Sequence, residues 1–183
     1  MGRPRRNQSR DTNQLLLFGL PPPDGTPPEI VTPYTIALYR VTLVRESSVQ
    51  VRSVKIRNSS DAAAIVRQHL ANVDREHFVV LLLNRKNGVI GINTVSVGSI
   101  TASVVHPREV FKPAILANAV AIICAHNHPS GDPQPSNEDR ALTARLVQGG
   151  KLLGIEVLDH VIVGDGTTQY FSFADNNLLG GGV

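Results

Sequence analysis

The sequence predicts an α/β domain in which helices flank a mixed β-sheet, and three features lead to this prediction. Two continuous apolar runs, at 77–84 and 119–128, have the length of strands and the composition of strands that are covered on both faces. Segments with helical capping signals precede the first run and follow the second. Asn87-Gly88 comes shortly after the first run and marks a hairpin, which requires an antiparallel pair.

Residues 1–33 are expected to form a disordered extension. The first ten residues hold four arginines and no acidic residue, and five prolines lie between Pro21 and Pro28. Proline at this density prevents regular hydrogen-bonded structure and gives an extended linker. The apolar insert Leu15–Leu20 is compatible with docking on a partner or on the chain's own surface, and the sequence does not choose between them.

The segment 34–52 is predicted to supply two leading strands, and a helix follows them. The stretches YTIALYRVTLV and VQVRSVKI have the β-branched composition and alternation of strands. Ser59-Ser60-Asp61 then provides the capping signal of an amphipathic helix that runs from Ala62 to about Ala71.

The main domain, predicted over 53–178, continues this alternation to its end. Its further predicted elements are the strands HFVVLLLN, VIGINTVSV and ITASVV, a helix that begins at Pro107, the strand AVAIICAHNH, a helix from about Asn137 to Leu153, and the closing strands EVLDHVIVGDG and TQYFSF. Pro113 lies inside the first of these two helices as an irregularity, and Gly154 ends the second. Residues 179–183 are expected to be a flexible tail.

The composition limits the compartment and the partners. A single cysteine excludes an intrachain disulfide. The first residues lack the apolar segment of a signal peptide, and no run reaches the roughly 18 residues of a membrane span, so a cytoplasmic location without a membrane partner is expected. Residues 1–10 contribute +4 to the net charge of +3, and 14 basic side chains face 15 acidic ones in the remainder. Any nucleic-acid contact is therefore expected to be weak and to use the arginine-rich tail.

The stretch AHNHPSGDPQPSNEDRALTARL, from Ala125 to Leu146, is the strongest candidate for a functional site. Side chains two residues apart on a strand share a face, so His126 and His128 project side by side where the apolar strand ends. Asp139 can join them if the loop rich in proline and glycine folds the helix start back over the strand end. Histidines and a carboxylate are the usual ligands of a catalytic zinc ion.

The same residues also fit a purely structural interpretation. Ser136 to Asp139 form a Ser-x-x-acid capping pattern, which by itself explains both end residues. Histidines at strand ends are often only polar edge residues. Cys124 shares the strand face with the histidines and is a candidate fourth ligand, and a buried, small apolar side chain is the alternative interpretation.

These motifs resemble those of a known family. His126-x-His128-Pro129, followed by Ser136-x-x-Asp139, is similar to the JAMM motif of the MPN-type metalloproteases. VHPREVF, AHNHPSG, PSNED and LDHVIVGDG are similar to segments of the bacterial RadC family, and the resemblance covers more than half of the chain. It implies the MPN (JAMM-type) fold, which is a mixed β-sheet flanked by helices with a cytidine-deaminase-like core.

The resemblance also implies a role for each matching residue. His126, His128 and Asp139 would bind one zinc ion per chain. Ser136 corresponds to the serine that hydrogen-bonds the oxyanion of the tetrahedral intermediate. Glu76, in REHFVVLLLN, corresponds to the upstream glutamate that acts as general base on the attacking water. The implied reaction is the hydrolysis of a peptide or isopeptide bond in a protein or peptide substrate.

Two other functions stay open at this point. Longer RadC proteins carry an N-terminal helix-hairpin-helix region that binds DNA, whereas prolines and two predicted strands occupy that place in this chain. A RadC-like DNA repair or mobile-element accessory protein is therefore the alternative to the hydrolase, and it would depend on the arginine-rich tail. A metal-bound interaction module without turnover is the third reading. The sequence predicts neither the substrate nor the oligomeric state.

Overall fold

The computed structural model describes residues 37–48, 55–98 and 105–180. The chain divides into two compact units, Met1–Arg40 and Val41–Val183, and the described helices and strands belong to the second unit. In this described part of the chain, no helix combines the length and the hydropathy that crossing a bilayer requires.

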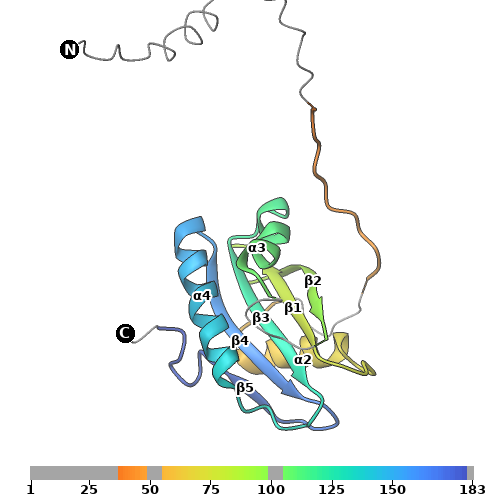
Figure 1. The fold of residues 1–183 in the computed structure, drawn as a ribbon, viewed down its shortest axis with the longest axis vertical. Helices are drawn as coiled ribbons and strands as arrows, with labels where there is room; N and C mark the ends of the chain where they lie inside the picture. Colours follow the sequence, from red (N-terminus) through yellow and green to blue (C-terminus); the bar gives the residue numbers. More distant parts are fainter. Residues whose placement is uncertain (1–36, 49–54, 99–104, 181–183) are drawn as a thin grey trace, which may run out of the picture. The chain divides into compact units, whose positions relative to one another are not determined.

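The second unit is built around a five-stranded sheet that helices cover on both faces (Figure 1). Its elements along the chain are helix α2 (Ser59–His69), strands β1 (His77–Leu83) and β2 (Val89–Val97), helix α3 (Pro107–Leu116), strand β3 (Ala121–His128), helix α4 (Asn137–Leu153), and strands β4 (Glu156–Gly164) and β5 (Tyr170–Ser172). The predicted fold class, a mixed sheet flanked by helices, is therefore confirmed.

The strand order is β2-β1-β3-β4-β5, and β3 and β4 form the parallel pair of this sheet. A parallel pair needs a crossover connection, which helix α4 supplies between the end of β3 and the start of β4. The central position of β3 explains its continuous apolar run, because every residue of this strand except His128 is buried. Polar residues at the end of β3 therefore lie where the chain leaves the sheet for the start of α4.

The two faces of the sheet carry separate hydrophobic cores. Helix α2 packs on one face, against alternate strand residues such as Val79 and Leu81. Helices α3 and α4 cover the other face, where Phe78 and Val80 are buried. Complete burial of one such side chain stabilises the fold by about 1.5–3 kcal/mol. A shift of a strand by one residue in its register would move each of its side chains to the other face of the sheet. The two cores together fix the register of the central strands.

The prediction of a strand over 34–44 is wrong for its described part. Residues 37–48 form neither helix nor strand, and Leu38 and Tyr39 are 97% and 89% exposed. An alternating sequence becomes a strand only where a neighbouring strand accepts its hydrogen bonds and covers its apolar side. No described strand pairs with this segment.

Other predictions fall on residues that the structure does not describe. Of the second leading strand, only its last residues are described, and Lys55 forms a single antiparallel bridge with Gly88. The predictions that lie wholly or largely outside the described residues concern the extension 1–33, the segment 49–54, the strand over 100–105, and the end of the tail, 181–183.

The start of α2 differs from the prediction because the capping residue is a different one. The helix begins at Ser59 rather than at Ala62, and Asn58 is its N-cap. The Asn58 side chain accepts a hydrogen bond of 2.9 Å from the backbone N–H of Asp61, so it satisfies one of the free donors of the first turn.

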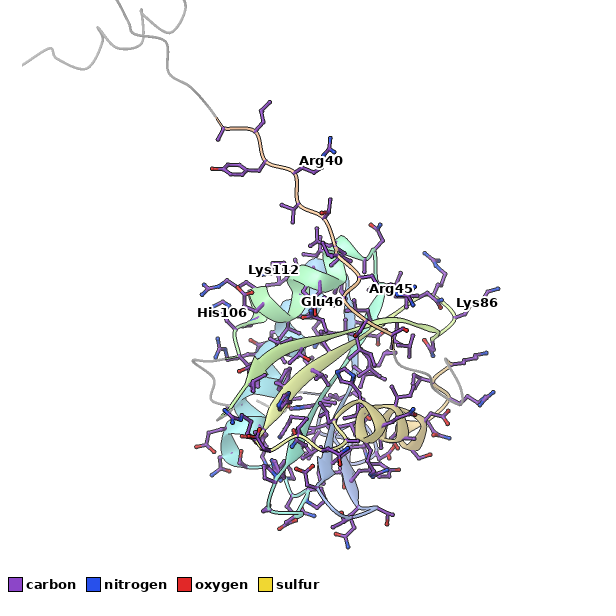
Figure 2. The ribbon with its side chains drawn as sticks, turned by 90° about the vertical axis from the view of Figure 1, so that its right-hand side faces the viewer. Arg40, Arg45, Glu46, Lys86, His106 and Lys112 are labelled. Carbon is purple, nitrogen blue, oxygen red and sulfur yellow. The ribbon has the colours of Figure 1, made fainter. Side chains whose placement is uncertain are left out.

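The hairpin predicted at Asn87-Gly88 is confirmed and joins β1 to β2. Asn87 has a φ of 55°, in the left-handed region that asparagine tolerates better than most residues. Its N–H donates to the carbonyl of Asn84, which closes the turn. Figure 2 shows Lys86 on this turn, pointing away from the sheet.

Candidate metal centre

The C-terminal end of β3 presents two histidines on one face of the sheet. His126 and His128 follow Cys124 at intervals of two, so all three side chains project toward the side that α3 and α4 cover. His126 is 0% exposed, and the His128 side chain is partly exposed. The Nε2 atoms of the two histidine rings lie 3.0 Å apart.

Strand pairing brings Glu76 to the same place. In the antiparallel pair of β1 and β3, Phe78 lies opposite His126. In an antiparallel pair, a step of two residues back along one strand matches a step of two residues forward along the other. Glu76, two residues before Phe78, therefore lies across from His128, two residues after His126. Glu76 Oε1 is 3.8 Å from His128 Nε2. Glu76, His126 and His128 each offer one ligand atom, and these atoms all lie within 4.8 Å of one another.

The start of α4 contributes Asp139 through the predicted capping box, which is confirmed. The backbone N–H of Asp139 donates to Ser136 Oγ, while Asp139 Oδ2 accepts from Ser136 N at 2.8 Å and from Ser136 Oγ at 2.6 Å. The second carboxylate oxygen, Oδ1, is thereby left for the site and lies 3.3 Å from His126 Nε2. Oδ2 also lies 3.7 Å from His128 Nε2, so the same carboxylate serves both the helix cap and the site.

The loop between β3 and α4 orients His128. Its ring Nδ1 lies 2.7 Å from the backbone oxygen of Asp132. Because a carbonyl only accepts hydrogen bonds, Nδ1 carries the proton, and the neutral ring keeps a lone pair on Nε2. Gly131, with a φ of 83°, makes the tight return possible, and its N–H donates to the His128 carbonyl.

A buried chain of hydrogen bonds orients His126 in the same sense. The Thr143 hydroxyl donates to the Asp139 carbonyl at 2.6 Å, so its oxygen accepts from His160 Nδ1, also at 2.6 Å. His160 Nε2 is then unprotonated and accepts from His126 Nδ1 at 2.9 Å. His126 consequently presents an unprotonated Nε2 to the site.

The donor set fits a divalent metal ion. Two Nε2 lone pairs converge at 3.0 Å, and the carboxylates of Asp139 and Glu76 lie beside them. Electron-rich atoms this close repel one another unless a cation lies among them. Neutral imidazole and carboxylate are ligands of zinc and of other divalent metals, and a fixed hydrogen bond on the second ring nitrogen is the usual support of a ligating histidine.

The electrostatic environment shifts the pKa values of the site residues in different directions. Burial lowers the pKa of His126 well below its usual range, with a further contribution from His160, and it lowers the pKa of His160 to about 4. The Asp139 carboxylate raises the pKa of His128 against the effect of burial. Burial would raise the pKa of Asp139, but His128, His126 and the bonds from Ser136 outweigh it and lower this pKa. At neutral pH the Asp139 carboxylate is therefore ionised, and the rings of His126 and His160 are neutral.

The sulfur on this face belongs to the core rather than to the site. Cys124 is buried among the apolar residues that α3 and α4 cover, and burial raises the pKa of its thiol. A metal ligand would have to be the thiolate, which this environment disfavours. The structural interpretation of Cys124 therefore fits better than that of a fourth ligand.

The structure brings all five residues singled out in the sequence into one region, and it adds two that sequence reasoning missed. His160 had a weak signal, since it stands beside Asp159 in the otherwise apolar stretch VLDHVIV of β4. Thr143 had none, because a threonine on a helix has many structural explanations. Both side chains are buried and act through their hydrogen bonds to His126 and to the Asp139 backbone.

Comparison with known proteins gives one family. Residues 56–178 match the family described as RadC-like JAB domain. A UPF0758 protein of Rubrobacter xylanophilus is 56% identical over 120 residues, which are 66% of this chain and 52% of that protein. A UPF0758 protein of Moorella thermoacetica is 55% identical over 122 residues, covering 67% and 52% of the two chains. The chain thus spans about half the length of these relatives.

Proposed function

Since this chain belongs to the RadC-like JAB domain family, we propose that its second unit is a zinc-dependent hydrolase that cleaves a peptide or isopeptide bond. The observation that carries the proposal is the convergence of the His126 and His128 lone pairs with two carboxylates. Zinc, when bound, supplies a Lewis acid that polarises a carbonyl and lowers the pKa of a water molecule toward about 7.

The two carboxylates suit different roles. Asp139 has a side chain that is 4% exposed and is held by two hydrogen bonds from Ser136, so Oδ1 is a rigid third ligand beside His126 and His128. The Glu76 side chain is 23% exposed and therefore reachable by water and by substrate. A carboxylate that water and substrate can reach is the better general base.

The proton can be followed through the proposed reaction. Glu76 accepts a proton from the attacking water while the new C–O bond forms at the substrate carbonyl. The same carboxyl then gives that proton to the amine nitrogen as the C–N bond breaks, so that an acid and an amine leave. In this proposal, Ser136 donates to the oxyanion when its hydroxyl turns from Asp139 Oδ2, which it now contacts, to the substrate.

The test compares Glu76→Gln with a matched surface change, Glu138→Gln, at the exposed start of α4. Glu76→Gln should retain one zinc ion per chain while cleavage falls by about 10²–10⁴-fold, because an amide cannot accept the proton. Glu138→Gln should behave as the wild type. Zinc is measured by elemental analysis, and cleavage is measured as new protein termini in a cell lysate by mass spectrometry.

Each contrary result has a distinct meaning. Loss of zinc from Glu76→Gln would make Glu76 a ligand and change the assignment of roles. Undiminished cleavage by a zinc-loaded Glu76→Gln protein would remove the general base from the proposal. If neither the wild type nor the variant cleaved any protein, a metal-bound module without turnover would be favoured.

A further inference from the structure

Asn127 lies between the two histidines of β3 and points away from them. The residue is 0% exposed, and its side chain makes three hydrogen bonds, which use both donors and one acceptor position. Oδ1 accepts from the backbone N–H of His77 at 2.8 Å, and Nδ2 donates to the backbone carbonyl of Arg75 at 3.0 Å and to Asp165 Oδ2 at 2.9 Å. Two of these three bonds hold main-chain atoms of the segment that leads into β1.

These two bonds reach the residues on either side of Glu76. The backbone pairing of β1 with β3 ends at Phe78 and His126, so the sheet itself does not hold Glu76 from the β3 side. Beyond that point, the side chain of Asn127 replaces the missing backbone pairing through its bonds to His77 and Arg75. On the β2 side, the N–H of Gly98 donates to the Glu76 carbonyl at 2.8 Å. The backbone of Glu76 is thereby fixed from both neighbouring strands.

The amide of Asn127 fits this place in one orientation only. The Arg75 carbonyl and the Asp165 carboxylate can only accept at these contacts, and the His77 N–H can only donate. A carboxylate at position 127 would face two acceptors, and an apolar side chain would remove both bonds to the partly buried main-chain groups, at a cost of about 0.5–1.5 kcal/mol each. These three contacts therefore require an asparagine at position 127, whereas a strand end without such contacts would tolerate many residue types.

We propose that Asn127 is a positioning residue that holds the Glu76 carboxylate at its place beside His126 and His128. The idea rests on the proposed function, in which Glu76 acts on the water that attacks the substrate. Misplacement of a reacting group by 1 Å can cost about 100-fold in rate, so a support on both sides of Glu76 has a catalytic reason.

The experiment uses the full chain loaded with Co²⁺ in place of zinc, because the visible spectrum of Co²⁺ reports its surroundings. Glu76→Gln gives the reference change of the spectrum. Asn127→Ala should retain one Co²⁺ per chain and shift the spectrum in the same direction. Adding Asn127→Ala to Glu76→Gln should then cause no further shift, because residues that act as a unit are not additive.

Asp165→Ala is the matched control, because it removes one bond of Asn127 and leaves both bonds around Glu76. It should keep the wild-type spectrum. Hydrogen exchange of the His77 amide, followed by NMR, should become at least about tenfold faster in Asn127→Ala and stay unchanged in Asp165→Ala. If Asn127→Ala does not fold, the pair Asn127→Asp with Asp165→Asn keeps the bonds to His77 and to position 165, removes the Arg75 bond, and is judged by the same spectrum.

The outcomes separate the two ideas. A shift with Glu76→Gln but a wild-type spectrum with Asn127→Ala, or fully additive shifts in the double variant, would overturn the positioning role alone. A spectrum that Glu76→Gln leaves unchanged would overturn the proposed role of Glu76 and the positioning role with it.

Discussion

Helices α2 and α4 begin with the same local chemistry on opposite faces of one sheet. Each has a polar N-cap, Asn58 or Ser136, whose side chain accepts the N–H of an aspartate three residues later. In both helices that aspartate accepts a backbone N–H in return: Asp61 from Arg57, and Asp139 from its own N-cap. As local motifs the two helix starts are nearly equivalent.

Their surroundings differ completely. Asp61 is half-buried on the α2 face, where the buried side chains near it are apolar. Asp139 is 3% exposed, and its Oδ1 and Oδ2 atoms lie 3.3 Å and 3.7 Å from the Nε2 atoms of His126 and His128, respectively. A capping pattern therefore fixes where an acid lies on a helix, while the strand packed against that helix decides whether the acid has further chemistry.

The largest expected difference between the two helix starts is in metal binding. Asp139→Ala removes a proposed ligand, so zinc affinity should fall by more than about 100-fold, which exceeds the usual effect of a supporting residue. Cleavage should disappear with the metal. Asp61→Ala should leave zinc affinity unchanged and cost only about 0.5–1 kcal/mol of folding stability, as expected for a charge in the first turn of a helix.

Isothermal titration of metal-free protein with zinc measures both affinities, and thermal unfolding of the same samples gives the stability. The distinction between the two helix starts would break down if Asp139→Ala bound zinc as tightly as the wild type. In that case Glu76 would be the third ligand, since it offers the next closest carboxylate to His128.

A second expected effect is a loss of folding stability at acidic pH. On the α4 face, burial lowers the pKa of His160 to about 4, compared with about 6.5 for an unfolded histidine. Between these two pH values the unfolded chain binds more protons than the folded one, so stability falls as the pH falls from about 6.5 to about 4. For one histidine the loss amounts to about 3 kcal/mol.

The measurement is urea unfolding of chelator-treated protein at several pH values, in parallel with His160→Gln. The variant cannot take up this proton, so its stability should depend on pH less steeply over that interval, by the same 3 kcal/mol or so. Parallel curves would show that His160 does not titrate in this way. His126, whose pKa is lowered in the same direction, contributes to both curves.

Much of the fold could be predicted because its signals are local. The apolar run of β1 indicates a strand covered on both faces, and Ser136 with Asp139 indicates the start of α4 without any knowledge of the rest. Gly154, with a φ of 68°, ends α4 as predicted because glycine adopts the left-handed region without strain. His126 and His128 were found for the same reason, since spacing by two on a strand is a local property.

The rest depends on contacts that no short window contains. Glu76 acquires meaning from the register of β1 against β3, and His160 from the crossover that lays β4 beside β3. The sequence around Glu76 indicates only an acid at the mouth of a strand, so its role came from a family resemblance. For the strand predicted over 34–44 the local pattern was present, but the prediction was wrong for the described part of this segment because no described strand pairs with it.

The smallest expected effect lies in the two caps themselves. Asn58→Ala and Ser136→Ala each remove a side-chain acceptor from a first-turn N–H, so each should cost about 1 kcal/mol of folding stability in metal-free protein.

The two variants should differ in their affinity for zinc. Ser136 also holds Asp139 Oδ2 through two bonds, of which only the backbone one survives in Ser136→Ala, so zinc affinity should fall by about tenfold in this variant and stay unchanged in Asn58→Ala. Chemical unfolding with and without zinc measures both quantities. Equal zinc stabilisation of the two variants would mean that the backbone bond from Ser136 is sufficient to orient the carboxylate.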